Sequence, residues 1–253
     1  MRPGSRLARL LAGLLVAALG AGTVAAGELA VTPVNGHLAA GAKAAALTLT
    51  NAGTEPTAFQ IRAFAWGQTA TDDPLTPTDD LLVSPPLGKL AAGARQTLRL
   101  VLRRQPVGRE ATYRILIDEI PPPAAPGAVR VALRLSIPVF AAPATAVATQ
   151  LGWRVERDGA AAWLVAINTG NRRASLRDLQ LTTAAGARLP IVTKTLPYVL
   201  AGATRRWPLA PPLPALGQVL RLTAGSGDAK AIDTQVTVTG VSPVAATADA
   251  RAQ

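Results

Sequence analysis

The chain has 253 residues, of which 49% are hydrophobic and 16% are charged, and it contains a single His and no Cys. These counts exclude disulfide frameworks, thiol catalysis, cysteine-based zinc sites and multi-histidine metal cages, while the length suits one large domain or two smaller ones. The formal net charge of +11 does not indicate nucleic-acid binding, because the arginines are spread singly along the chain and the few aromatic residues form no stacking platform.

Residues 1–26 have the pattern of a cleavable secretory signal peptide. Arginines in the first nine residues precede an apolar run that ends with Val24 and Ala26 before Gly27. The run contains several Gly and a Thr, and it is shorter than the roughly 20 strongly apolar residues of a membrane span. We therefore expect cleavage near residue 26 and an exported, periplasmic protein.

The remaining chain reads as short strands punctuated by Gly and Pro, the pattern of antiparallel sandwiches. In chain order the first expected strands are 28–34, 44–51, 59–66, 81–84, 87–90, 96–102, 113–120 and 129–140, with 67–80 as a polar loop. A second set begins at Thr149 with an Asp-Gly hairpin at 158–159 and continues with 163–168, 176–182, 189–195, 205–209, 219–223 and 234–239.

An echo in the turns indicates two similar units. Asn-Ala-Gly at 51–53 and Asn-Thr-Gly at 168–170 each close an alternating strand. We therefore predict domains at 27–142 and 146–242, joined by a short connection. The Ala-rich, polar residues 243–253 are expected to form a disordered tail.

The last strand of the first unit shows an unusually long alternation. Its apolar positions are Val129, Val131, Leu133, Leu135, Ile137 and Val139. Successive side chains of a strand point to opposite faces, so at about 3.3 Å per residue this would be a strand with one apolar face some 35 to 40 Å long. Two interpretations stay open: a buried sandwich strand, or an edge that pairs with another chain.

Candidate catalytic groups are sparse. His37 has no G-x-S-x-G motif to accompany it, and the four Asp residues at 72, 73, 79 and 80 lack the spacing of a calcium loop. There is no phosphate-binding glycine motif. We expect a protein that is not an enzyme and that has no metal or cofactor.

Several segments of the first unit together resemble the periplasmic pilus chaperones of the chaperone-usher pathway, the PapD-like superfamily. They are Ser84-Pro85-Pro86, residues 93–100, the segment 110–121 with Tyr113-Arg114, and Ile137-Pro138-Val139-Phe140. The Tyr-Arg and Pro-Val-Phe variants are most similar to the archaic branch, which assembles spore-coat-U-type pilins. The resemblance covers most of the first unit and is weak over the second.

The resemblance implies an all-β fold with two immunoglobulin-like sandwich domains in an L or boomerang arrangement. It implies that 129–139 is a donor strand that completes a pilin, and that the complex is delivered to an outer-membrane usher without ATP. Self-association of the free chaperone is a further expectation. The competing hypotheses are an exported adhesin or pilus structural protein, and a hydrolase on a β scaffold.

The resemblance also implies an anchor for the pilin's C-terminal carboxylate. Better-known members use an Arg in the first strand and a Lys in the donor strand, whereas this chain has Asn35 and Pro138 near those places. The substitute candidates are Arg114, Arg99 and Arg134, because a guanidinium holds a carboxylate by two parallel hydrogen bonds.

Overall fold

The computed structural model describes residues 29–120, 131–193, 198–227 and 231–241. All the regular secondary structure in these ranges consists of β-strands. The expected signal peptide, the expected tail and Val129 lie outside the described residues. Within the described ranges, no helix has the length and apolar character needed to cross a membrane.

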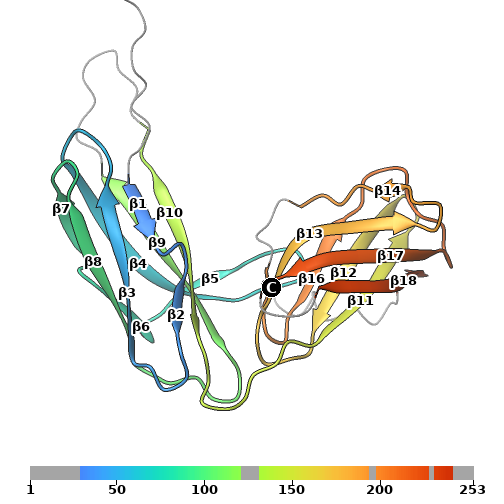
Figure 1. Ribbon diagram of the computed structural model, residues 1–253, viewed down its shortest axis with the longest axis horizontal. Coiled ribbons are helices and arrows are strands. Elements are labelled where there is room, and N and C mark those ends of the chain that lie inside the picture. Colours follow the sequence, from blue (N-terminus) through green and yellow to red (C-terminus); the bar gives the residue numbers. More distant parts are fainter. Residues whose placement is uncertain (1–28, 121–130, 194–197, 228–230, 242–253) are drawn as a thin grey trace, which may run out of the picture.

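Two lobes make up the molecule, and Figure 1 shows them side by side at an angle. The first contains β1 (Leu29–Thr32), β2 (Gly36–Leu38), β3 (Ala44–Asn51), β4 (Thr57–Trp66), β5 (Leu75–Pro77), β6 (Leu81–Ser84), β7 (Leu87–Leu90), β8 (Arg95–Leu102), β9 (Ala111–Ile120) and β10 (Arg134–Ala141). A four-stranded sheet in the order β1-β3-β8-β6 packs on a larger one in the order β2-β10-β9-β4-β5, with β7 also on β4.

The core of the first lobe follows from alternation along these strands. Leu47 and Leu49 on β3 face Ile115 and Ile117 on β9 across the two sheets, and all four are buried in one hydrophobic cluster. Successive side chains point to opposite faces, so Thr48 and Thr50 of β3 and the half-buried Leu116 of β9 lie on the outer faces. The alternation read from the sequence therefore predicts which face is inside.

The second lobe contains β11 (Leu151–Asp158), β12 (Ala161–Asn168), β13 (Ala174–Thr183), β14 (Arg188–Leu189), β15 (Tyr198–Val199), β16 (Thr204–Pro208), β17 (Val219–Ser226) and β18 (Ile232–Gly240). The strands run in the order β14-β13-β17-β18-β11-β12-β16, with β15 on β13. Val155, Leu164, Leu222 and Trp207 lie in its buried cluster. The all-β, two-sandwich fold class expected from the sequence is confirmed.

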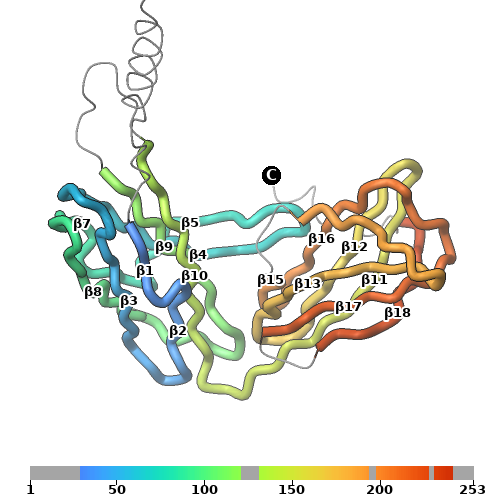
Figure 2. Tube along the Cα trace, turned by 45° about the horizontal axis from the view of Figure 1, so that its top comes forward, coloured from blue at the N-terminus to red at the C-terminus, as the bar shows by residue number. Residues whose placement is uncertain are grey.

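The segment 67–80 differs from the polar loop that we expected. β5 pairs antiparallel with the end of β4, from Phe64 to Trp66. Figure 2 shows this β4–β5 hairpin extending from the first lobe to the second. The main-chain N–H of Arg206 on β16 donates to the carbonyl of Ala70 at 2.8 Å. The hairpin is therefore an arm between the lobes, and sequence polarity concealed it because its polar groups bond to the other lobe.

Candidate functional site

The last strand of the first lobe, β10, has a partly unpaired edge. On one side it pairs antiparallel with β9 along its whole length. On the other side it pairs with β2 in parallel orientation, and only over Val139–Ala141. Among the described strands, none pairs with this second side from Arg134 to Pro138.

The main-chain groups along this open edge can be assigned from the ladder. The Glu119 N–H donates to the Leu133 carbonyl at 2.9 Å, so the odd residues of β10 direct their hydrogen-bonding groups toward β9. In an antiparallel ladder the bonded residues alternate. Arg134 and Ser136 consequently direct theirs to the open edge, where a further strand can pair.

The apolar side chains of β10 become more exposed from its C-terminal end toward its N-terminal end. Val139 is fully buried and Ile137 is 7% exposed, both in the core of the first lobe. Leu135 and Leu133 are half-buried and pack against the rim of the same core. Val131, which precedes the strand, is 73% exposed. The strand is thus shorter than the expected 129–140, because its ladder with β9 begins only at Leu133.

The path of the chain before β2 leaves the edge open. β1 pairs with β3 in the four-stranded sheet, and the chain then crosses at Pro33 to reach β2 in the other sheet. β2 lies tightly on the end of β10, since a Cβ on Gly36 would stand 2.9 Å from a methyl of Val139. Among the described strands, only this short segment pairs with that edge of β10, which leaves the edge open from Arg134 to Pro138.

Arg114 lies beside the covered end of β10, and its side chain is buried. It stands in register with Pro138 on β10 and Phe64 on β4. The residue is 4% exposed, its Cζ lies 3.9 Å from the centroid of the Trp66 ring, and its Nη2 has no hydrogen-bond partner among the described residues. Burial lowers the pKa of Arg114, while Asp73 and Tyr198 oppose that shift. The guanidinium is a buried cation with an unused donor.

The aromatic cluster next to Arg114 joins the two lobes. Trp66 and Phe140 of the first lobe contact Tyr198 of the second, with ring centroids 5.8 Å and 5.4 Å from it. Leu200 packs into the same buried cluster. Arg114 therefore lies at the junction of the lobes, where the open edge of β10 begins.

A buried ion pair also crosses the junction. Glu110, directly before β9, accepts hydrogen bonds from the Arg173 guanidinium and, at 3.1 Å, from the Arg173 main-chain N–H. The Arg173 Cζ lies 3.6 Å from the centroid of the Phe140 ring. Loss of either charge would leave the other buried without a partner.

The hairpin arm makes a second set of bonds to the other lobe. Asp73 accepts a 2.7 Å hydrogen bond from the fully buried Arg205. Gln68 donates to the Tyr198 carbonyl at 3.0 Å and accepts from the Leu200 N–H at 2.9 Å. Sequence reasoning missed these junction residues, because partners more than 100 positions apart leave no local pattern.

The other two anchor candidates lie elsewhere. Arg99 is exposed on β8 in the four-stranded sheet, between Ala46 and Ser84, away from the open edge. Arg134, on the outer face of β10, pairs with Asp118, which also accepts a 2.8 Å hydrogen bond from Arg62. Of the three arginines, Arg114 is the buried one with an unused donor.

Groups that could support catalysis or metal binding do not converge. His37 is exposed on β2, opposite Phe140. Asp73 is engaged by Arg205, and Asp80 forms a surface ion pair with Arg104. The described residues contain no cluster of three or more His, Asp or Glu side chains that could hold a metal ion.

Comparisons with known proteins agree on the type of fold. The crystal structure of the CsuC–CsuE chaperone–tip adhesion subunit complex from archaic Csu pili of Acinetobacter baumannii matches with a TM-score of 0.63 and 24% identity, over 85% of this chain and 99% of that one. The YadV chaperone matches at 0.61 and 18% identity, over 83% and 99%. The Salmonella enterica SafA pilin–SafB chaperone complex matches at 0.58 and 20% identity, over 83% and 95%.

Sequence comparison finds a family match for the first lobe. No curated protein matches the chain significantly. Residues 28–146 match the model of the pili and flagellar-assembly chaperones, PapD N-terminal domain. This range contains all ten strands of the first lobe, with the open edge of β10 and Arg114. The first lobe therefore matches the N-terminal domain of the pilus-assembly chaperones, and the match ends before the second lobe.

Proposed function

We propose that this protein is a periplasmic chaperone that binds pilus subunits by donor-strand complementation and delivers them to an outer-membrane usher. The observation that carries the proposal is the edge of β10: no described strand pairs with it from Arg134 to Pro138, and its apolar side chains become more exposed toward Val131. The similar CsuC and SafB chains were crystallised with a tip adhesion subunit and a pilin. The match of residues 28–146 to pilus-assembly chaperones and the sequence of residues 1–26 support a periplasmic location.

The open edge supplies both components of strand addition. The main-chain groups of Arg134 and Ser136 can extend a partner's ladder, while alternate side chains fill its core. Val131, Leu133 and Leu135 are the side chains free to do so, each contributing about 1.5 to 3 kcal/mol when fully buried. Ile137 and Val139 already fill the chaperone's own core, so we leave them out of the donated set.

Arg114 is the proposed anchor for the subunit's C-terminal carboxylate. Stacking on Trp66 holds the plane of its guanidinium, and the free Nη2 can donate to an incoming carboxylate. Its register with Pro138 places it at the end of the open edge. A subunit strand lying along β10 would end here, which fixes its register by a charge rather than by side-chain shape.

The donor-strand proposal is tested by charging the two half-buried leucines. Leu133→Asp with Leu135→Asp should lower the affinity for a pilin at least about a hundredfold and abolish co-purification, because two carboxylates would enter an apolar groove. The free variant should remain folded, since both side chains lie at the rim of the core. Circular dichroism and thermal unfolding check this.

A matched control comes from the second lobe. Ile232→Asp with Thr234→Asp places the same charges on β18, and it should leave pilin capture unchanged. Pilin recovery with the β10 variant at the wild-type level would remove the strand from the site. An exported adhesin or structural subunit would instead polymerise without capturing a pilin.

The anchor is tested with a double-mutant cycle. Arg114→Ala should weaken pilin binding by about 1 to 3 kcal/mol, the scale of a lost charged hydrogen bond. A pilin extended by two C-terminal glycines, which moves its carboxylate, should bind the wild type more weakly and should be insensitive to Arg114→Ala. Arg99→Ala is the control and should bind normally. Equal losses for both pilins would show that Arg114 does not contact the carboxylate.

A further inference from the structure

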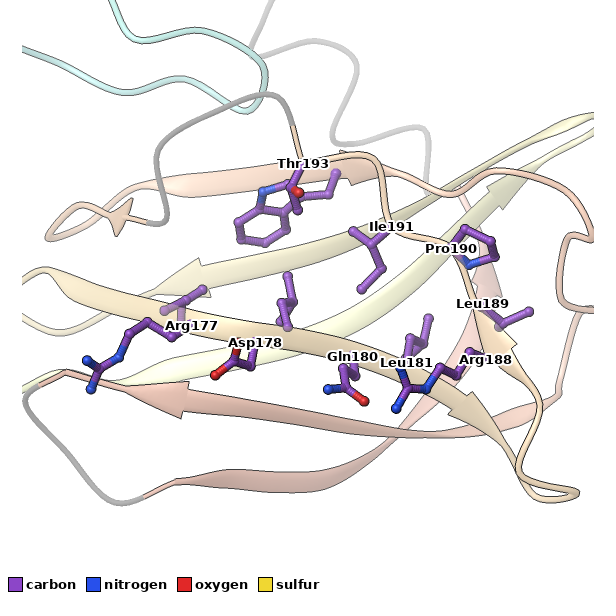
Figure 3. Close-up of a pocket in the computed structure, with 12 residues that line it drawn as sticks. Arg177, Asp178, Gln180, Leu181, Arg188, Leu189, Pro190, Ile191 and Thr193 are labelled. Atoms are coloured by element: carbon purple, nitrogen blue, oxygen red, sulfur yellow. The ribbon is translucent and has the colours of Figure 1, made fainter.

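The second lobe contains a cavity of about 770 Å³ beside β13, which is distant from β10 and has no part in the proposed function. Its inner wall is apolar and includes Leu176, Leu181, Leu189, Ile191 and Trp207. Figure 3 shows Ile191 pointing from one wall toward β13. Trp207 is stacked on Trp153 at a ring separation of 6.2 Å, so the wall is held in place. The volume falls within the range of small-molecule sites, about 300 to 1,000 Å³.

The mouth of the cavity is basic. Arg177 and Arg188 line it, together with Asp178 and Gln180. Both arginines are exposed, and neither forms an ion pair with another described residue. Two unpaired guanidinium groups outnumber the one carboxylate. The mouth therefore favours a negatively charged group on a ligand whose other part is apolar.

The backbone of β13 disfavours a strand as the occupant. β13 bonds to β15 at Ala174–Ser175 and to β14 at Leu181–Thr182, which leaves the edge between them unpaired among the described strands. Along that stretch, the ladder that β13 forms with β17 on its other edge shifts register between Arg177 and Gln180, and Asp178 has a φ of 51°. An irregular backbone disrupts the regular spacing of ladder groups. An added strand would find no regular register here, whereas a flexible apolar chain needs none.

We propose that this cavity binds a single-chain amphiphilic anion of the fatty-acid class. The hydrocarbon chain lies against Trp207 and the surrounding leucines, and the carboxylate faces Arg177 and Arg188. Affinity then depends on chain length and on charge. Each additional buried methylene lowers the dissociation constant about fourfold until the cavity is full.

Calorimetric titration of the full chain with dodecanoate, below its micelle concentration, tests the proposal. We expect one saturable site, weaker binding of octanoate, and weaker binding of the uncharged dodecanol. In methyl spectra of isoleucine-labelled protein, Ile191 should shift on titration while Ile115, in the first lobe, should not. The absence of saturation, equal affinity for dodecanol, or an unshifted Ile191 would overturn the proposal.

Variants separate the two parts of the site. Ile191→Arg should abolish binding, and Arg177→Ala with Arg188→Ala should weaken dodecanoate binding about two- to fivefold without affecting dodecanol. Arg221→Ala, on β17 outside the cavity, is the matched control. If Ile191→Arg does not fold, the wild-type methyl spectra decide. Broadening of Ile191 with protein concentration, without fatty acid, would assign the cavity to a second copy of the chain and overturn the proposal. Pilin capture should be unaffected throughout, so failure here does not bear on the proposed function.

Discussion

The final strands of the two lobes, β10 and β18, occupy equivalent places but end differently. Each pairs antiparallel with the strand before it and then, over its last three residues, in parallel with a strand at the start of its lobe. β10 makes the parallel contact from Val139 to Ala141 with β2, and β18 makes it from Val238 to Gly240 with β11. The backbone frame of the two edges is therefore shared.

The two edges differ in their side chains. Aligned on these parallel contacts, Leu135 of β10 corresponds to Thr234 of β18. The outward position before it is charged and ion-paired in both strands, as Arg134 with Asp118 and as Asp233 with Arg221. Polar and charged residues on an edge discourage pairing with other chains. The edge of β18 in the second lobe is therefore less suited to pairing with another chain than the edge of β10 in the first. The proposed binding depends on a few side chains rather than on the fold.

A buried asparagine is another shared part of the frame. Asn51 donates to the carbonyls of Glu55, Leu90 and Ala91, and accepts from the Gly53 N–H. Asn168 does the same in the second lobe, donating to Arg172 and Val199 and accepting from the Gly170 N–H. The repeated Asn-x-Gly of the sequence thus marks one turn built twice.

The largest expected effect on stability comes from a substitution at the junction between the lobes. It tests whether the two similar lobes stabilise each other. Glu110→Ala should lower the free energy of unfolding by about 3 to 5 kcal/mol, since it leaves the Arg173 guanidinium buried without its partner. Urea unfolding measures the loss. Arg221→Ala, which breaks an exposed pair inside one lobe, is the control and should cost much less. Similar costs would show that the junction contributes no special stability.

The asparagine comparison is sharpened by Asn51→Ala and Asn168→Ala, each in an otherwise unchanged chain. Each should lower the free energy of unfolding by about 1 to 3 kcal/mol, because buried carbonyls lose their donor. The two losses should agree within about 1 kcal/mol if the turns are equivalent. A large cost at one position and none at the other would contradict the equivalence.

The smallest expected effect is the pH dependence of stability that comes from the carboxylates near the two edges. Desolvation raises the pKa of Asp118, but hydrogen bonds from Arg134 and Arg62 outweigh it and lower the pKa below 3.8. Its stabilising contribution is therefore full above the unfolded pKa and is lost as the pH falls through the folded value. The ion pairs of Asp118 with Arg134 and Arg62 are partly exposed, so we expect them to contribute less than about 1 kcal/mol to the free energy of unfolding.

Unfolding of wild type and Asp118→Asn, compared at pH 6 and pH 3, measures this contribution. The variant should be less stable at pH 6, and the difference should shrink at pH 3. Asp233→Asn should show the same direction, because its hydrogen bond with Arg221 lowers the pKa of that carboxylate. A difference that is independent of pH would exclude a titrating role for Asp118.

Much of the fold could be read from the chain because alternation and turn residues are local. The buried faces of β3 and β9, the strand nature of β10 and the paired Asn-x-Gly turns all depend on neighbours within a few positions. The arm at 67–80 does not follow from the sequence for the opposite reason, since Asp73 and Gln68 satisfy their polar groups in the other lobe. The Tyr-Arg pair in the sequence indicates Arg114 as a candidate, but its burial and its stacking on Trp66 depend on three strands lying together.

The sequence alone determined the all-β class, the two units, the apolar row toward Val139 and the family resemblance, because side-chain periodicity and local motifs carry that information. Only the tertiary structure decided where β10 is covered. That depends on the crossing of the chain at Pro33 and on three residues of β2, more than 90 positions away in the sequence. The free edge, the junction ion pairs and the cavity beside β13 are all relations between distant segments, and no local pattern of residues encodes them.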